Sequence, residues 1–344
     1  MHSSIRRAPV RCAPKGFRAR RGLACLSLMA LAAALTAALP GAAGAQSFPA
    51  KPVKIIVPSA PGDGSDILAR SIGAKLSERW GVPVTVENRP GAGGVLGTEA
   101  AARAAGDGNT VIMGNAGSHA INQALYPKLP YDVLRDFTPV TLVASAPNVF
   151  VIHPAVPAKT VAEFIALAKK EPGRFAYASG GNGSSAHLNA EMLKALAGIE
   201  MTHVPYKGAS PAIADVMSGQ VQLMIGNLPP ILPHIKSGKV RALAVTTLTR
   251  FAATPELPPV ADTVPGFESL AWFGLFTPAS TAKETLAKWH TDVTAVLALP
   301  EIRERVAQLG FDVVGNTPEA YAALVRADIA KWQKVVKQSG AKVE

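Results

Sequence analysis

The sequence predicts an α/β fold built as two lobes, each a mostly parallel sheet flanked by helices. Apolar, β-rich runs alternate with segments of helical periodicity along the chain, which is typical of α/β proteins. Several runs, such as Val53–Val57 and Ala242–Val245, are apolar at nearly every position, as strands covered on both faces are. Two connecting runs, Ala144–Asn148 and Gly266–Leu270, join similar α/β blocks without a long linker. We therefore expect the chain to cross between the lobes twice.

Runs of apolar and β-branched residues give the expected strands. In chain order they are Val53–Val57, Val84–Glu87, Thr110–Met113, Val140–Ala144, Val149–His153, Phe175–Ala178, Thr202–Val204, Val221–Ile225, Arg241–Thr246, Trp272–Thr277 and Phe311–Val314.

Helices are predicted from apolar stripes at i, i+4 spacing, from N-caps and from C-terminal glycines. They are Ser65–Trp80, Val161–Lys170, Ala186–Ala197, Pro211–Ser218 and a last helix that opens at Thr317-Pro318-Glu319. The last helix carries the stripe Val325, Ile329, Trp332 and Val336, which predicts one buried face.

Residues 1–45 have the pattern of a secretory signal peptide rather than of a folded segment. Seven basic residues precede the apolar core Leu23–Leu39, and Ala43-Gly44-Ala45 supplies a small-residue cleavage site. The apolar core is at the lower length limit for a membrane span, so we expect cleavage near Ala45 and export. Arg20-Arg21 leaves open whether export follows the general or the twin-arginine route.

Removing this segment changes the composition of the chain. The formal net charge falls from +11 to about +4, so the basic balance gives no indication of a nucleic-acid partner. Both cysteines, Cys12 and Cys25, lie inside the segment, which excludes disulfides and zinc–thiolate sites from the mature chain. The histidines have no metal-ligand spacing, and we expect no metal and no cofactor.

Two glycine- and serine-rich loops have the arrangement that binds anions in α/β proteins. Pro58–Asp66 and Ser179–Ser185 each follow a strand and open a helix. Glycines let the backbone approach a ligand, while the free N–H groups and the dipole of a helix N-terminus attract an anion. One such loop is more often an ordinary capped turn, but two in separate halves favour one shared anionic ligand.

Other loops are less specific. Gly114–His119 and Gly226–Pro230 also follow strands, and they either set specificity or serve as ordinary connections. The glycine-dense run Asn88–Gly97 lacks the register of a dinucleotide-binding or phosphate-binding loop, and we interpret it as a structural turn.

Catalytic motifs are weak in this chain. No G-x-S-x-G nucleophile elbow is present. His187, just inside the second helix, and Asp66 are the candidates for a general base, so a secreted α/β enzyme acting on a small carboxylate is the alternative to a binding protein. For Asp66 the ordinary interpretation is a helix cap or an acceptor for a ligand amine.

Six stretches recur in the order and spacing of a known family. They are Phe48–Pro58, Gly64-Ser65-Asp66, Val86–Gly94, Leu129-Pro130-Tyr131-Asp132, Val204–Gly208 and Ala242–Thr246. In these stretches the chain resembles the Bug receptors, the solute-binding proteins of tripartite tricarboxylate transporters. The resemblance covers the chain from Phe48 to the C-terminus.

The resemblance implies a type II periplasmic-binding-protein fold, with residues 46–146 and 269–344 in lobe 1 and 147–268 in lobe 2. It implies a monomeric, non-enzymatic receptor of the periplasm that captures a small carboxylate by hinge closure and delivers it to membrane transporter subunits. A receptor that presents its ligand to a signalling partner would have the same sequence features. Ligand contacts are expected from Ser59, Ala60, Gly62, Asp63, Gly64, Ser65, Asp66, Ser118, Gly183, Ser184, Ser185, His187, Tyr206 and Asn227.

One position departs from the family pattern. Where the family usually has Gly-Gly, this chain has Gly62-Asp63. A second carboxylate ~6 Å from a ligand carboxylate costs ~3 kcal/mol at an effective dielectric constant near 20. Either Asp63 points to solvent, or the ligand carries a compensating amine, or the ligand is less anionic than a tricarboxylate.

Overall fold

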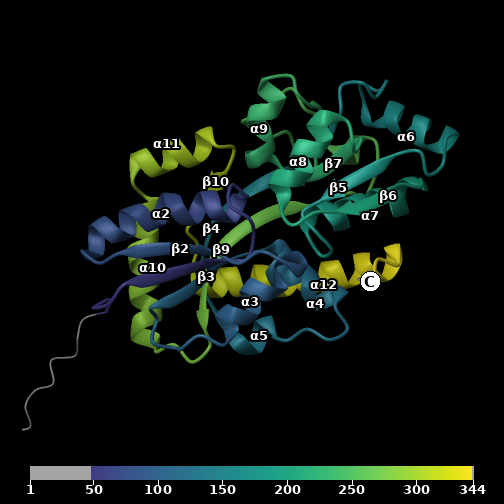
Figure 1. Ribbon diagram of the computed structural model, residues 1–344. Coiled ribbons are helices and arrows are strands. Elements are labelled where there is room, and N and C mark those ends of the chain that lie inside the picture. Colours follow the sequence, from purple (N-terminus) through teal and green to yellow (C-terminus); the bar gives the residue numbers. More distant parts are fainter. Residues whose placement is uncertain (1–47, 343–344) are drawn as a thin grey trace, which may run out of the picture. The chain divides into compact units, whose positions relative to one another are not determined.

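The computed structural model describes residues 48–342, and it has the predicted α/β fold with two lobes (Figure 1). The predicted signal peptide, residues 1–45, and both cysteines lie outside the described residues. Between Phe48 and Lys342 no helix is long and apolar enough to cross a membrane.

The strands of the described residues form one continuous sheet in the order β2-β1-β3-β9-β4-β7-β5-β6, with β8 and β10 both paired to β4. Their bounds are β1 (Val53–Val57), β2 (Val84–Asn88), β3 (Thr110–Asn115), β4 (Phe137–Ile152), β5 (Ala176–Ser179), β6 (Thr202–Pro205), β7 (Leu223–Asn227), β8 (Arg241–Val245), β9 (Leu270–Pro278) and β10 (Asp312–Val313).

Strand β4 joins the two lobes. Its residues from Phe137 to Pro147 pair antiparallel with β9, and its residues from Asn148 to Ile152 pair antiparallel with β7 and β8. The sequence predicted two strands here because Pro147 and its neighbours interrupt the apolar run. Pro147 is nevertheless in register with Leu270 of β9, so the strand continues through the crossing.

The sheet is mixed rather than mostly parallel within each lobe. The outer pairs β1–β2, β1–β3, β5–β6 and β5–β7 are parallel, as expected for βαβ units. The pairs that involve β4 or β9 are antiparallel, because these two strands lie next to the crossings and enter each lobe from the other. The antiparallel strands are therefore a consequence of the two-lobed topology.

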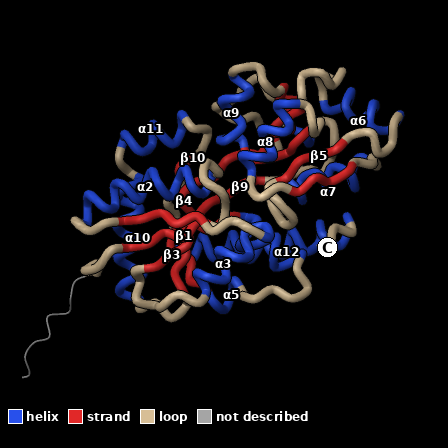
Figure 2. Tube along the Cα trace, in the orientation of Figure 1, coloured by secondary structure: helices blue, strands red, loops and turns tan. Residues whose placement is uncertain are grey.

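Helices cover both faces of the sheet (Figure 2). Their bounds are α2 (Gly64–Trp80), α3 (Val95–Ala102), α4 (Asn122–Leu125), α5 (Val133–Asp136), α6 (Val161–Lys170), α7 (Ser185–Ala197), α8 (Ala209–Ser218), α9 (Leu228–Lys236), α10 (Lys283–Leu297), α11 (Pro300–Gln308) and α12 (Pro318–Ser339), with short 3₁₀ or π turns η1 (Ala92–Gly94), η2 (Gly117–Ile121) and η3 (Val260–Asp262). The five predicted helices are all present, whereas α3, α4, α5, α9, α10 and α11 were not predicted.

The C-terminal helix packs against both lobes. Val325, Ile329 and Trp332 of its predicted stripe are buried in a core cluster that also contains Leu188 of α7. Helix α12 contacts β4, η2 and α4 on one side and α7 on the other. Each of these side chains stabilises the fold by roughly 1.5–3 kcal/mol when fully buried.

The two crossings lie side by side and are joined by buried polar groups. The Nδ2 group of Asn148 donates a hydrogen bond of 2.9 Å to the Ser269 hydroxyl, and the Thr246 hydroxyl donates one of 2.7 Å to the Ser269 carbonyl. All three side chains are buried: Asn148 lies within β4, Thr246 directly follows β8, and Ser269 directly precedes β9. The predicted residue limits of the two lobes stay a prediction.

Candidate ligand-binding site

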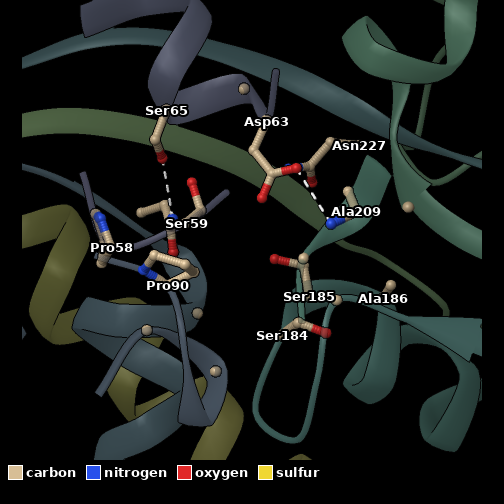
Figure 3. A pocket seen from close by; sticks show the side chains of 18 of the residues that line it. Pro58, Ser59, Asp63, Ser65, Pro90, Ser184, Ser185, Ala186, Ala209 and Asn227 are labelled. Carbon is tan, nitrogen blue, oxygen red and sulfur yellow. Dashed lines mark hydrogen bonds between the residues drawn. The ribbon is translucent and has the colours of Figure 1, made fainter. Parts of the chain in front are cut away.

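A small cavity lies between the lobes, where helix N-termini from both of them converge (Figure 3). Gly64 and Ser65 at the start of α2 line it from the first lobe, and Ser185 of α7 and Ala209 of α8 line it from the second. Its volume is about 80 Å³. A cavity needs roughly 10–15 Å³ of such volume for each water, so this one has room for on the order of six waters. That is the size of a small organic ion.

Half of the predicted contact residues line this cavity. They are Ser59, Asp63, Gly64, Ser65, Ser184, Ser185 and Asn227. The others lie beside or behind the lining: Ala60, Gly62, Asp66, Ser118, Gly183, His187 and Tyr206. The lining also includes residues that were not predicted, among them Pro58, Pro90, Gly91, Gly93, Gly94, Asn115, Gly117, Gly180, Ala186, Gly208, Ala209, Met224, Gly226 and Phe273.

Asp66 fixes the shape of the first loop. Its carboxylate accepts hydrogen bonds of 2.9 Å from the Gly62 N–H, from Arg70 Nε and from Asn88 Nδ2. Burial opposes ionisation, but Arg70, Gly62 and Asn88 outweigh it and hold the pKa of Asp66 below its ordinary value. No side chain caps α2, so the first N–H groups of the helix are left for another acceptor.

Asp63 spans the cleft instead of pointing to solvent. Its side chain is only 8% exposed, and its Oδ1 accepts a hydrogen bond of 3.1 Å from the Ala209 N–H at the start of α8 (Figure 3). Of the three alternatives for Asp63, the structure does not have the first, a side chain that points to solvent, because the opposite lobe covers it. Burial raises the pKa of Asp63 to about 7, although the hydrogen bond from Ala209 opposes the shift.

In the second loop, Ser184 is the N-cap of α7 and accepts a hydrogen bond of 3.4 Å from the His187 N–H. The N–H groups of Ser185 and Ala186 therefore stand free at the cavity wall. The His187 ring lies behind the loop, where its Nδ1 accepts from the Gly183 N–H at 3.2 Å. Burial lowers the pKa of His187, and the ring borders a different hollow. His187 thus supports the loop from behind.

Ser118 also acts from behind the lining. Its N–H donates to Asn115 Oδ1 at 3.0 Å, and Asn115 Nδ2 in turn donates to the Ser65 hydroxyl at 3.0 Å. The amide that lines the cavity from this loop is thus Asn115. Tyr206 donates its hydroxyl hydrogen to Asp215 at 2.6 Å and lies outside the cavity lining.

The two lobes contact each other closely at two glycines, Gly93 and Gly208. A Cβ atom added to Gly93 would lie 2.0 Å from the Asn182 carbonyl oxygen, and one added to Gly208 would lie 2.6 Å from the Ala60 Cβ. The Tyr126 hydroxyl lies 3.3 Å from the same Asn182 oxygen. The interpretation of Asn88–Gly97 as a purely structural turn is incomplete, because this run forms part of the cavity wall and touches the other lobe.

Comparison with known proteins agrees with this geometry. Residues 68–341 match the model of the tripartite tricarboxylate transporter family receptor. The chain belongs to this family of solute-binding receptors. It is 35% identical to Protein BugT of Bordetella pertussis over 311 residues, which cover 90% of this chain and 95% of that protein. The predicted family is therefore confirmed, and it is a receptor family rather than an enzyme family.

Two solved relatives contain small dicarboxylates. The structure of R. palustris Rpa4515 with adipate has a TM-score of 0.83 and 36% identity, and covers 86% of this chain and 100% of that one. MatC from Rhodopseudomonas palustris with bound malate has a TM-score of 0.81 and 34% identity, and covers 84% and 100%.

Proposed function

We propose that this chain is an exported receptor that captures a small carboxylate between its lobes and delivers it to the membrane subunits of a tripartite tricarboxylate transporter. The observation that carries the proposal is the interlobe cavity, into which α2 and α7 present their N-termini. Each helix offers first-turn N–H groups that no side chain accepts from, Ser65 in α2 and Ser185 in α7, and the positive end of its dipole, which together bind a carboxylate without a basic side chain.

Capture follows from the contacts between the lobes. The crossings lie on one side, at Asn148 and Ser269, so a hinge motion there opens the cleft and exposes both helix N-termini. Closure brings Asn182 against Gly93 and Ala209 against Asp63, and it removes the ligand from water. Family membership and the relatives with adipate and malate support both the carboxylate and the transporter.

The proposed receptor forms and breaks no covalent bond. Of the two candidate bases, Asp66 uses its carboxylate on three donors of its own lobe, and His187 faces a different hollow. Neither reaches the cavity, whereas a general base must lie within hydrogen-bond distance of its substrate. We further propose that the protein is a periplasmic monomer, that it binds no nucleic acid, and that its signal peptide is cleaved near Ala45.

Native mass spectrometry combined with thermal melting tests this function. The full chain is expressed, exported and purified from the periplasm without refolding, and small carboxylates, sugars and inorganic cations are added in turn. A carboxylate at about a hundredfold excess over its Kd should stabilise the protein by roughly 2.7 kcal/mol and be recovered unchanged. Stabilisation by a sugar or a cation alone, or consumption of the carboxylate, would contradict the proposal.

A further inference from the structure

The cavity has an unusual charge arrangement for a site that accepts an anion. Asp63 is the one ionisable side chain among the residues that line it, and no Lys, Arg or His side chain does. The Asp63 carboxylate is buried and has given up most of its water. A buried carboxylate needs hydrogen-bond donors or a cation to compensate for this loss. Here the Ala209 N–H donates to it at 3.1 Å, and the Ala60 backbone and the Ser59 hydroxyl assist, but no cation among the described residues does.

A second acceptor lies in the same cavity. Asn227, at the end of β7 in the other lobe, has its Oδ1 atom buried without a hydrogen-bond partner. Figure 3 shows the Asn227 and Asp63 side chains pointing into the same part of the cavity, on the side toward Ala209. Buried acceptors of this kind are costly unless a donor reaches them, so this end of the cavity is built to receive a hydrogen-bond donor.

The two ends of the cavity thus have opposite preferences. The free N–H groups at Ser65 and Ser185 favour a negative group, while Asp63 and Asn227 favour a positive one. We propose that the ligand is an amino carboxylic acid, whose carboxylate lies at the N-termini of α2 and α7 and whose ammonium group is received by Asp63 and Asn227. This assignment rests on the proposed function and narrows its ligand class.

Matched ligands that differ only in the amino group test the assignment by isothermal titration calorimetry. The pairs are alanine with propionate, aspartate with succinate, and glutamate with glutarate. For at least one pair the amino acid should bind the natural protein roughly 10- to 100-fold more tightly, since a hydrogen bond to a charged group contributes about that factor. The advantage should be larger at pH 8 than at pH 5, because Asp63 must be ionised to attract the ammonium.

Two variants separate the charge from the interlobe contact. Asp63→Asn keeps an oxygen for the Ala209 N–H but removes the charge, so the preference for the amino acid should disappear. Asp262→Asn, which removes an exposed carboxylate far along the chain in η3, should keep it. A melting curve for each variant establishes whether it is folded. If Asp63→Asn does not fold, the ligand pairs still test the assignment on the natural protein.

The outcomes distinguish this inference from the proposed function. If the inference holds, succinate does not bind more tightly than aspartate, and glutarate does not bind more tightly than glutamate. The opposite result for either pair, above all with an affinity that rises toward pH 5, means that a protonated Asp63 accepts a second carboxylate. That result overturns the ligand class and leaves the receptor function intact. If no carboxylate of either series binds or stabilises the protein, the proposed function fails, and the ligand class fails with it.

Discussion

Replacing Gly93 by alanine should hold the cleft open. Gly93 has a φ of 61°, and its added Cβ would lie 2.0 Å from the Asn182 carbonyl oxygen of the other lobe. A carbon and an oxygen in ordinary contact are about 3.3–3.6 Å apart, so the lobes must separate by roughly 1 Å or more. That displacement also breaks the contact between Tyr126 and Asn182. We expect carboxylate affinity to fall at least about tenfold, which corresponds to about 1.4 kcal/mol.

Gly81→Ala is the matched control. Gly81 has a φ of 68°, and an added Cβ would have nothing within 4 Å. Both substitutions force alanine into the left-handed region, at roughly 1–2 kcal/mol of the unfolding free energy, but only Gly93→Ala blocks closure. Urea titrations should therefore give similar stabilities, while calorimetry should give weak binding for Gly93→Ala alone. If the two variants bind equally well, the contact between Gly93 and Asn182 is not part of the bound state.

Three further changes test individual side chains. Asp66→Asn weakens the charge-assisted bonds to Arg70 and Gly62, so we expect urea titrations to show a loss of about 1.5–3 kcal/mol of unfolding free energy. Tyr126→Phe removes a hydroxyl that contacts the other lobe, and calorimetry should show ligand affinity reduced by a few-fold, or about 1 kcal/mol. Burial raises the pKa of Asp63 from 3.8 to about 7, so between these pH values the folded chain keeps a proton that the unfolded chain loses. The unfolding free energy that Asp63 contributes is complete below about pH 4. It falls by up to about 4 kcal/mol as the pH rises to about 7. Asp63→Asn should remove this fall, which melting curves at pH 5 and pH 8 would measure.

Each of these expectations has an opposite result. An Asp66→Asn protein as stable as the natural one would mean that the first loop does not depend on that carboxylate. Unchanged ligand affinity in Tyr126→Phe would show that the hydroxyl contact is dispensable for closure. Parallel pH profiles for Asp63→Asn and the natural protein would mean that Asp63 is solvated in solution, as it would be if the cleft were mostly open.

The strands and the two ligand loops were predictable because their signals are local. Apolar runs identified every strand of the described chain, although β4 was divided at Pro147. The loops before α2 and α7 follow the strand–glycine–helix pattern that sequence reading detects directly. Helix α9 was missed because prolines at 229, 230 and 233 look like loop residues, yet the first two occupy the first turn, where proline fits.

The rest of the site depends on contacts that no local pattern records. Gly93 and Ala209 belong to the cavity wall only because the lobes meet there. Gly93 touches Asn182 and Ala209 touches Asp63, and each pair is separated by at least 89 residues in the sequence. The same closure decides the direction of polar side chains: it brings Asp63 into the cavity and leaves His187 behind its loop. The dense glycines of Asn88–Gly97 are the one local signal of this close approach, because Gly93 lies against the Asn182 carbonyl.

In the proposed receptor, one carboxylate contacts the N-termini of α2 and α7 at the same time. Nuclear magnetic resonance of the amides tests it most directly, by titrating the best-stabilising carboxylate into isotope-labelled protein. We predict that the amide protons of Ser65 and Ser185, on opposite lobes, shift downfield together and give a single Kd. A response in only one lobe, or in neither of these amides while the ligand binds elsewhere, would contradict capture between the lobes.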